Sequence, residues 1–226
     1  MNIELYEPYS CPILVGSLNP PNENIDEILK ILKEKEKQYL ESNDDDDTCY
    51  VGDKNCFDKL HIFKEFEWLN KQVENMLFVF IEMYGIDKNK CNFYIQKSWP
   101  VFLKNGDSGV NSHTHPNSHI SFVFYLQTED DNENGKLHFT NRLDFWNGTV
   151  PFEDSSISFV AKKNNCIMFP SSMMHWVTPY SGDLTRISIT YDIIITSKNI
   201  PGISELEMMI SDPTFWRKID GKALSS

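Results

Sequence analysis

Basic residues are scarce in this sequence. Its 226 residues include 21 Lys and Arg against 33 Asp and Glu, which gives a formal net charge of −12. A surface with this charge repels phosphate groups and anionic lipids at physiological salt. The composition therefore argues against nucleic-acid binding and against attachment to a membrane surface.

Long apolar runs are also missing. A bilayer span needs about 20 consecutive apolar residues, and the longest candidate run, residues 76–84, is short and contains Glu82. The first eight residues have neither the basic start nor the apolar stretch of a targeting peptide. We expect a chain that does not cross a membrane and that works in the cytoplasm.

Cysteine is sparse and forms no CxxC pair. The five cysteines are Cys11, Cys49, Cys56, Cys91 and Cys166. A chain of this size needs no disulfide to hold its core, so we expect reduced thiols. Cys49 and Cys56 with His61 are a weak zinc signature. The acidic segment 42–48 is expected to be a solvated loop rather than a metal site.

The 40% of apolar residues suffices for one substantial core and is marginal for two. We expect a single domain over residues 1–226. Residues 1–90 would supply supporting helices and a first strand, residues 91–196 a β core, and residues 197–226 a C-terminal tail. The tail is open to three interpretations, which are a lid, a contact in a homodimer and a packed extension.

Helical periodicity marks two segments of the first ninety residues. In the first, apolar residues recur with the i, i+3, i+4, i+7 spacing of an amphipathic helix, at Ile25, Ile28, Leu29 and Leu32. Asn24 and Glu27 resemble the capping box that opens a helix. The second segment, 66–84, has the same spacing, and Gly85 suits the position just after a helix end. Each stripe predicts a helix packed on a core.

From Cys91 onward the periodicity changes to two, which predicts strands. Asn-Gly pairs suited to hairpin turns occur at 105–106, 134–135 and 147–148. Along 120–126 one face is apolar, and the other carries Ser121, Val123 and Tyr125. Along 186–193 one face is again apolar, and the other carries Arg186, Ser188, Thr190 and Asp192. Strands with one apolar and one polar face suit an antiparallel sandwich or barrel that holds a ligand.

Histidines gather just before the first of these strands. Three of the six are His113, His115 and His119. Residues i and i+2 of an extended segment point the same way, so His113 and His115 can direct two imidazoles at one metal ion. His175 follows a strand that Pro170 ends, and it is the candidate for a distal ligand. We expect His119 to have a packing or surface role.

Arg186 is the second candidate for function, because it lies on the polar face of its strand. A buried guanidinium needs an anion, since an unpaired buried charge is costly. A carboxylate ligand would supply that partner, and the planar fork of Arg matches a carboxylate bidentately. The competing interpretation is an ordinary ion pair with an acidic surface side chain.

Four stretches together resemble one enzyme family. They are His113-Thr-His115-Pro-Asn-Ser-His-Ile-Ser-Phe-Val-Phe-Tyr125-Leu, Gly135-Lys-Leu-His-Phe, Ile167-Met-Phe-Pro170 with His175, and Arg186-Ile-Ser188-Ile. In this combination they are similar to the iron(II)- and 2-oxoglutarate-dependent oxygenases of marine bacteria and their phages, distant relatives of prolyl 4-hydroxylases. Ile3-Glu-Leu-Tyr and Pro12-Ile-Leu-Val also resemble the first strand of that family, so the similarity extends through about Thr196.

The resemblance implies a mainly β fold with supporting helices, built on a double-stranded β-helix core of the jelly-roll or cupin-like kind. It implies Fe(II) held by His113, His115 and His175. The compartment would be the cytoplasm, or the host cytoplasm if a phage encodes the chain.

The resemblance also implies 2-oxoglutarate and dioxygen as cosubstrates. Arg186 would hold the distal carboxylate of 2-oxoglutarate, and Ser188 and Tyr125 would complete that site. The implied reaction couples oxidative decarboxylation of 2-oxoglutarate to hydroxylation of an unknown substrate, with a prolyl or other protein side chain as the acceptor by analogy. We expect Trp99 and Trp146 to be core residues rather than to line the entrance.

One residue departs from the pattern of the wider superfamily, which is His-x-Asp or His-x-Glu. His115 stands in the position of that carboxylate. A bound metal would keep its full 2+ charge unless an outside carboxylate or dianionic 2-oxoglutarate offsets it. The second ligand is therefore either His115 or an outside carboxylate, with His119 as a further alternative.

Two other functions fit parts of this pattern. A cupin metalloenzyme that uses no 2-oxoglutarate fits the His-x-His pair and the spacing of Pro170 and His175, but it has no requirement for Arg-x-Ser on the next strand. A non-catalytic jelly-roll binding module would carry the histidines as structural residues, and it would bind no metal.

Overall fold

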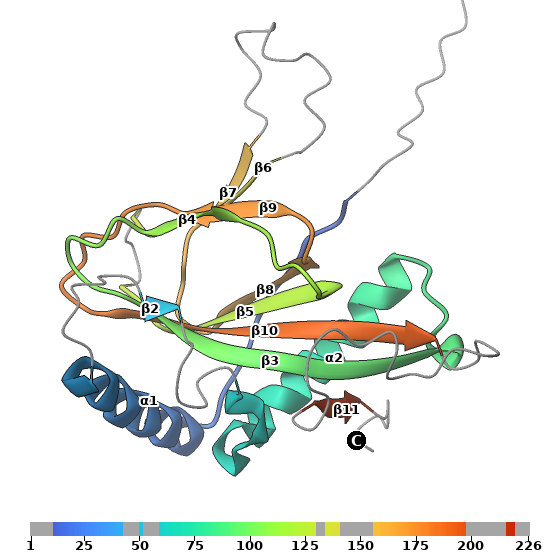
Figure 1. Cartoon of the computed structure of the whole chain (residues 1–226), viewed down its shortest axis with the longest axis horizontal. Coiled ribbons are helices and arrows are strands. Elements are labelled where there is room, and N and C mark those ends of the chain that lie inside the picture. Colours follow the sequence, from blue (N-terminus) through green and yellow to red (C-terminus); the bar gives the residue numbers. More distant parts are fainter. Residues whose placement is uncertain are drawn as a thin grey trace, which may run out of the picture.

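The computed structural model describes residues 11–42, 50–51, 59–129, 134–140, 156–197 and 216–219. In these ranges the chain forms two layers of antiparallel strands, and two α-helices lie on the outer face of the larger layer (Figure 1). The two layers face each other across an interior that contains the candidate site. Four features noted in the sequence lie outside the described residues: Cys49, Cys56, the acidic residues 43–48 and Trp146.

The larger sheet has the strand order β1-β8-β5-β10-β3-β11, and β2 also pairs with β3. These strands are β1 (Leu14–Ser17), β2 (Tyr50–Val51), β3 (Cys91–Leu103), β5 (Ile120–Gln127), β8 (Asn165–Pro170), β10 (Arg186–Ser197) and β11 (Arg217–Ile219). The smaller sheet has the order β4-β9-β6-β7. Its strands are β4 (Val110–His113), β6 (Leu137–Thr140), β7 (Ser156–Phe159) and β9 (Met174–Val177).

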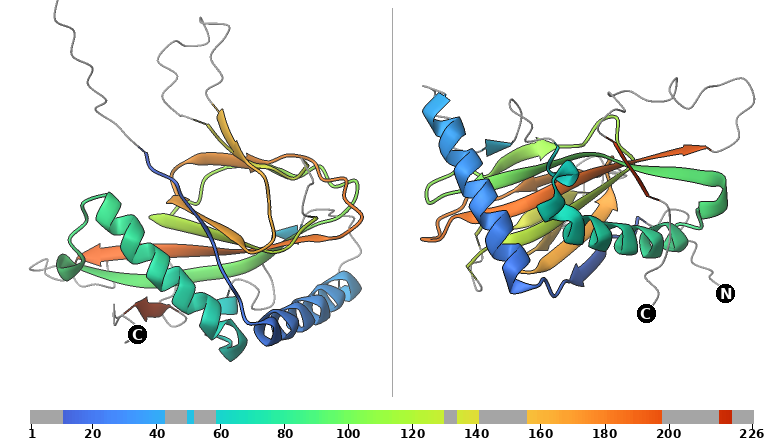
Figure 2. Two further views of the ribbon diagram at one scale, coloured as in Figure 1. Left: turned by 180° about the vertical axis from the view of Figure 1, so that it is seen from behind. Right: turned by 90° about the horizontal axis from the view of Figure 1, so that it is seen from below.

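The helices are α1 (Asn22–Ser42) and α2 (Glu67–Met83), with short 3-10 turns at η1 (Leu60–Ile62), η2 (Lys64–Phe66) and η3 (Lys88–Lys90). Seen from behind and from below, both α-helices cross the same face of the larger sheet (Figure 2). None of the helices in the described part of the chain has the length and apolar character needed to cross a bilayer.

Both predicted helices form, with one correction at the start of α1. The predicted stripe is buried at Ile25, Ile28 and Leu32. The capping box at Asn24 is wrong, because the helix already begins at Asn22 and the Asn24 N–H donates to the Pro21 carbonyl at 3.1 Å. At the end of α2, Gly85 has φ +66°, the left-handed geometry that a residue following a helix adopts most easily without a Cβ.

The alternation predicted for β5 and β10 is confirmed by the burial of their side chains. The helix-facing side of the two strands contributes Ile120, Phe122, Phe124, Leu126, Ile187, Ile189, Tyr191 and Ile193 to the main core. Each such burial contributes about 1.5–3 kcal/mol. The other side of both strands faces the smaller sheet and holds the polar residues.

Two of the three Asn-Gly pairs, those at 105–106 and 134–135, do not make the predicted hairpins. The turn at 105–106 joins β3 of the larger sheet to β4 of the smaller one, and the pair at 134–135 precedes β6 after the chain leaves β5. Both turns therefore carry the chain from one layer to the other, which is how the strands of a jelly roll alternate between sheets. The pair at 147–148 lies outside the described residues.

The C-terminal residues that the structure describes are packed against the larger sheet. β11 pairs with β3, and Trp216 packs on Tyr94 with ring centroids 5.8 Å apart. Arg217 binds Glu67 of α2 with both terminal nitrogens, at 2.6 and 2.7 Å. This part of the predicted tail is a packed extension. The three described cysteines, Cys11, Cys91 and Cys166, are free thiols as predicted.

Candidate functional site

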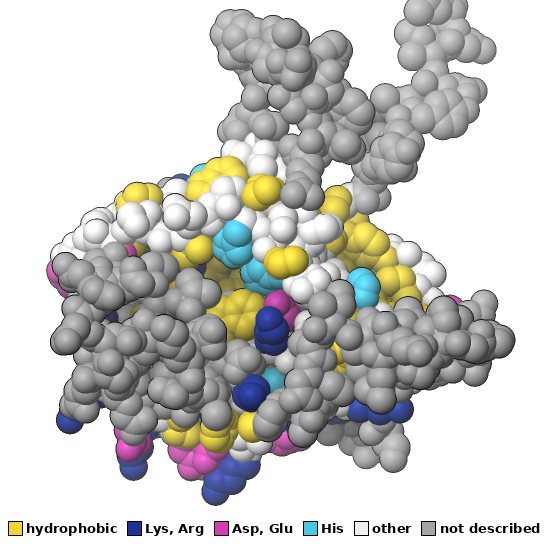
Figure 3. Space-filling model, viewed as in Figure 1, with side chains coloured by type: hydrophobic (Ala, Val, Ile, Leu, Met, Phe, Trp, Pro, Cys, Tyr) yellow, Lys and Arg dark blue, Asp and Glu magenta, His cyan; other side chains and the backbone are white. Residues whose placement is uncertain are grey.

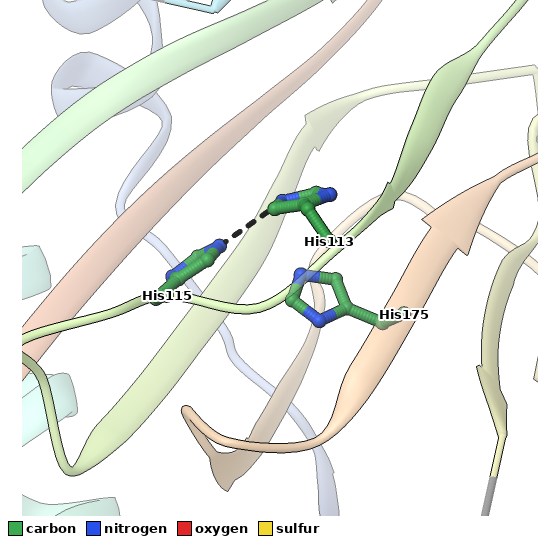
Figure 4. A group of neighbouring side chains, drawn as sticks. All are labelled: His113, His115 and His175. Atoms are coloured by element: carbon green, nitrogen blue, oxygen red, sulfur yellow. Dashed lines mark hydrogen bonds between the residues drawn. The ribbon is translucent and has the colours of Figure 1, made fainter. Parts of the chain in front are cut away.

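Three histidines meet between the two sheets. His113 ends β4, and His175 on β9 is its direct partner in the strand ladder. His115 lies two residues past the end of β4. One ring nitrogen from each histidine lies within 4.8 Å of the others, and the Nε2 atoms of His113 and His115 are 3.3 Å apart. Figure 4 shows the three rings gathered around a common point.

A glycine allows the two strands that carry His113 and His175 to approach. Gly109 has φ +86°, and a Cβ at this position would lie 2.1 Å from the backbone oxygen of Val177. Only glycine fits such a close contact without moving the backbone. The turn before β4 thereby brings this strand against β9 in the register that pairs the two histidines.

Each ring is oriented by a hydrogen bond from its other nitrogen. The acceptors are backbone carbonyls for two rings and a carboxylate for the third: His113 Nδ1 to Asn111 O at 2.7 Å, His175 Nδ1 to Met173 O at 2.9 Å, and His115 Nδ1 to Asp192 Oδ1 at 2.7 Å. Because a carbonyl oxygen only accepts, Nδ1 carries the proton in the first two rings. This leaves the Nε2 lone pairs available to a metal, as in most protein metal sites.

The burial of the site keeps two of its imidazoles neutral. Burial lowers the pKa of His113, although the Asn111 carbonyl raises it in part. Burial lowers the pKa of His175 to about 3, against a smaller raising effect from the Met173 carbonyl and with a further lowering from the other two histidines. A neutral imidazole is the form that binds a metal ion.

Aromatic side chains pack on the histidine rings. Trp99 lies 5.4 Å from the His115 ring and Phe169 lies 4.9 Å from the His175 ring, measured between centroids. Trp99 is buried, as predicted. It also lines the pocket around the histidines, so the expectation that it belongs to the core alone is corrected. His119 is not part of this group, since its Nδ1 accepts the Ile195 N–H at 2.9 Å.

The same pocket contains the predicted anion-binding residues. Tyr125, Arg186 and Ser188 are all at most 2% exposed. The Arg186 Cζ lies 5.0 Å from the centroid of the Tyr125 ring, and its Nη1 is 3.4 Å from Ser188 Oγ. Arg186 and Ser188 share a face because they are two residues apart on β10.

Tyr125 has a fully buried hydroxyl for which the described residues supply no hydrogen-bond partner. Burial raises the pKa of this hydroxyl, and the charge of Arg186 lowers it by less. Leaving a buried polar group without a hydrogen-bond partner costs about 1–3 kcal/mol of stability. Binding of a ligand that makes a hydrogen bond to this hydroxyl would therefore be favoured.

Apolar walls connect the two halves of the pocket. The pocket that holds the histidines and Arg186 is also lined by Val101, Val123, Leu137, Phe169 and Val177. Figure 3 shows histidine and apolar side chains inside the hollow between the two layers. Gly135, at φ +65°, borders this region, and a Cβ there would lie 3.1 Å from Arg186 Cδ. The turn before β6 thus leaves room for the guanidinium.

Two site residues had no role in the sequence-based prediction. Asp192 and Ser121 are Cα partners across β10 and β5, and both contact His115 Nδ1, at 2.7 and 2.9 Å. The signal for both was present, because each belongs to the polar face of its strand. The contact with His115 could not be predicted, since it depends on the register of strands that are far apart in the sequence.

A scan against family models gives one match, to the family described as "Putative 2OG-Fe(II) oxygenase", over residues 97–192. This segment is under half of the chain, and it contains the three histidines, Tyr125, Arg186 and Ser188. The match confirms the resemblance to the 2OG-Fe(II) oxygenases that the motifs indicated, and this family implies Fe(II) and 2-oxoglutarate as cofactors. No curated protein matches the chain.

Three solved structures are similar in fold to this chain. The carbocyclase SnoK of nogalamycin biosynthesis is 8% identical, with a TM-score of 0.60 over 92% of each chain. The epimerase SnoN of the same biosynthesis is 10% identical, with a TM-score of 0.55 over 86% of each chain. A Pseudomonas putida prolyl-4-hydroxylase is 11% identical, with a TM-score of 0.50 over 82% of this chain and 93% of the other. The predicted double-stranded β-helix fold is confirmed by these likenesses.

Proposed function

We propose that this protein is an Fe(II)- and 2-oxoglutarate-dependent dioxygenase that hydroxylates its substrate. One observation carries the proposal, which is that a single pocket holds three converging imidazoles and a buried group of Arg186, Tyr125 and Ser188. A metal site alone would fit many enzymes, and a buried arginine alone would fit many anion-binding proteins. Their common pocket favours a metal and a carboxylate ligand that bind side by side.

The three histidines fit an iron(II) ion. Imidazole nitrogen is a ligand type that suits Fe(II), and a facial set of three protein ligands leaves positions open for small molecules. In this assignment His113, His115 and His175 bind through Nε2. Their Nδ1 hydrogen bonds hold each ring in the required orientation.

The other half of the pocket fits the distal carboxylate of 2-oxoglutarate. Arg186 would bind it with its planar fork, and the Tyr125 hydroxyl and the Ser188 hydroxyl would add hydrogen bonds. The apolar walls between the two ends suit the methylene groups of the ligand. Burial of the guanidinium strengthens its interaction with a carboxylate, because water no longer screens the pair.

Bound Fe(II) with 2-oxoglutarate supplies the oxidative decarboxylation to succinate and carbon dioxide that drives hydroxylation by dioxygen. The chain's own residues bind and orient these groups and keep water away from them. We propose a prolyl or other protein side chain as the acceptor. This proposal is supported by the similarity in fold to the Pseudomonas putida prolyl-4-hydroxylase. The carbocyclase and the epimerase have a similar fold and catalyse other reactions.

The proposal is tested by turnover of 2-oxoglutarate in the absence of a substrate. Purified protein supplied with Fe(II), 2-oxoglutarate and air is expected to form succinate slowly. Both the His175→Ala substitution and a 2-oxoglutarate analogue that cannot decarboxylate are expected to stop this reaction. Fe(II) binding without any binding of 2-oxoglutarate would indicate a cupin-type metalloenzyme instead. Binding of neither at millimolar concentration would indicate a non-catalytic module.

A further inference from the structure

The three-histidine site raises a question of charge, because three neutral imidazoles leave the full 2+ charge of an iron(II) ion in a buried pocket. Such a charge is costly to bury without a compensating anion nearby. The nearest carboxylate in the described part of the chain that touches this site is that of Asp192. It is 5% exposed, and it belongs to β10, at the far end of the polar face that begins with Arg186.

The carboxylate contacts His115 on the ring edge that faces away from the other two histidines. Its Oδ1 lies 2.7 Å from His115 Nδ1, whereas His115 Nε2 is the atom that lies 3.3 Å from His113. Asp192 would therefore contact the metal ligand His115 rather than the metal ion itself. The Nδ1–H of His115 donates to this oxygen when Nε2 is the ligand atom.

A chain of hydroxyl groups holds this arrangement in place. Ser121 Oγ donates to Asp192 Oδ1 at 2.9 Å and lies 2.8 Å from Ser171 Oγ, which in turn donates to Ser118 Oγ at 3.0 Å. Ser171 also accepts the backbone N–H of His115 at 2.9 Å through its carbonyl. The loop that carries His115 is thus tied to the same residues that fix the carboxylate.

We propose that Asp192 supplies, through His115, the negative charge that a carboxylate ligand supplies in the two-histidine, one-carboxylate sites. Hydrogen bonding to a carboxylate makes an imidazole a more basic and more strongly donating ligand. Asp192 is a positioning residue in this account, and His115 remains the ligand. The proposal rests on the function proposed above, and it answers the departure at His115 from the His-x-Asp pattern.

The direct test is the affinity of the protein for Mn(II), measured from the electron paramagnetic resonance signal of the free ion without 2-oxoglutarate or oxygen. Asp192→Asn keeps the size of the side chain and an oxygen that accepts from His115 and Ser121, so it removes little except the charge. We expect about a tenfold to hundredfold loss of affinity. Asp192→Ser, which removes the same charge with a smaller side chain, is expected to lose as much.

Ser121→Ala is the matched control. It removes hydrogen bonds to both His115 and Asp192 but leaves the charge, and we expect a clearly smaller loss of affinity than in Asp192→Asn. Equal losses in Ser121→Ala and Asp192→Asn would overturn the proposal in favour of a structural role for this cluster. A loss within threefold in both Asp192 variants would also overturn it.

Rescue gives a readout that a structural role would not produce. In the His115→Asp/Asp192→Asn double variant a carboxylate is placed at the ligand position itself, and affinity is expected to return to within about threefold of the parent. A double variant that binds no better than Asp192→Asn would contradict the role of the charge. His175→Ala separates this inference from the proposed function, because undiminished Mn(II) binding in that variant would refute the metal site as a whole.

Discussion

The two faces of strand β10 have different roles, because one packs in the core and the other lines the pocket. Ile187, Ile189 and Ile193 point toward the helices and are at most 1% exposed. Arg186, Ser188, Thr190 and Asp192, which alternate with them along the strand, face the pocket or touch a histidine at its edge. The same backbone therefore anchors the core and carries the site.

The difference between the two faces explains how the site is kept in place. On the helix side, close packing of apolar groups fixes the strand, because interiors pack densely and resist movement. On the pocket side, polar groups are buried at a cost, and the packed face offsets this cost. Changes on the helix side should therefore affect stability, and changes on the pocket side should affect binding.

Ile189→Ala is expected to have the largest effect on stability. Ile189 is fully buried in the main core between β3 and β5, and truncation of such a side chain costs about 2–5 kcal/mol. Urea unfolding monitored by circular dichroism would measure this loss. The Mn(II) affinity of the protein that remains folded should stay within about threefold of the parent, and a large loss of affinity would show that the faces are not separate.

Arg186→Ala is expected to have the next largest effect, on the opposite face. Loss of a charge-assisted pair with a carboxylate costs about 1.5–3 kcal/mol, or about tenfold to hundredfold in 2-oxoglutarate affinity. Calorimetric titration measures this, with Arg186→Lys as a control that keeps the charge but loses the fork. Unchanged affinity in Arg186→Ala would remove the main reason for preferring a 2-oxoglutarate enzyme over a cupin.

Glu67→Gln is expected to have a small effect. The pair with Arg217 has good geometry, but the Glu67 side chain is 62% exposed, so the loss should be about 1 kcal/mol or less. The hydrogen bond from Arg217 lowers the pKa of Glu67, so its contribution is present above the unfolded pKa and is lost as the pH falls through the folded value. Urea unfolding of parent and variant should differ at pH 7, and the difference should shrink as the pH falls below the unfolded pKa of a glutamate side chain.

Period-two alternation was sufficient to predict which residues of β5 and β10 share a face. It correctly grouped Tyr125 with Ser121, and Arg186 with Ser188. The helical stripes of α1 and α2 were equally clear, because amphipathic periodicity reflects the one face that each helix buries. These are local patterns, which a sequence records directly.

Features that depend on contacts between distant segments could not be predicted in this way. The bond between His115 and Asp192 spans 77 positions and follows from strand register. The Asn-Gly turns at 105–106 and 134–135 were assigned to hairpins because local turn chemistry does not reveal which sheet the next strand joins. Trp99 was assigned to the core alone, although the same burial places it beside His115.

The central claim is that one pocket binds a metal ion and 2-oxoglutarate together. The most direct measurement is anaerobic calorimetric titration of 2-oxoglutarate into the protein with and without Mn(II). Because two ligands that contact each other promote each other's binding, we predict that Mn(II) raises 2-oxoglutarate affinity by about tenfold or more and that His175→Ala abolishes this gain. Equal affinity with and without the metal in the parent protein would contradict the account.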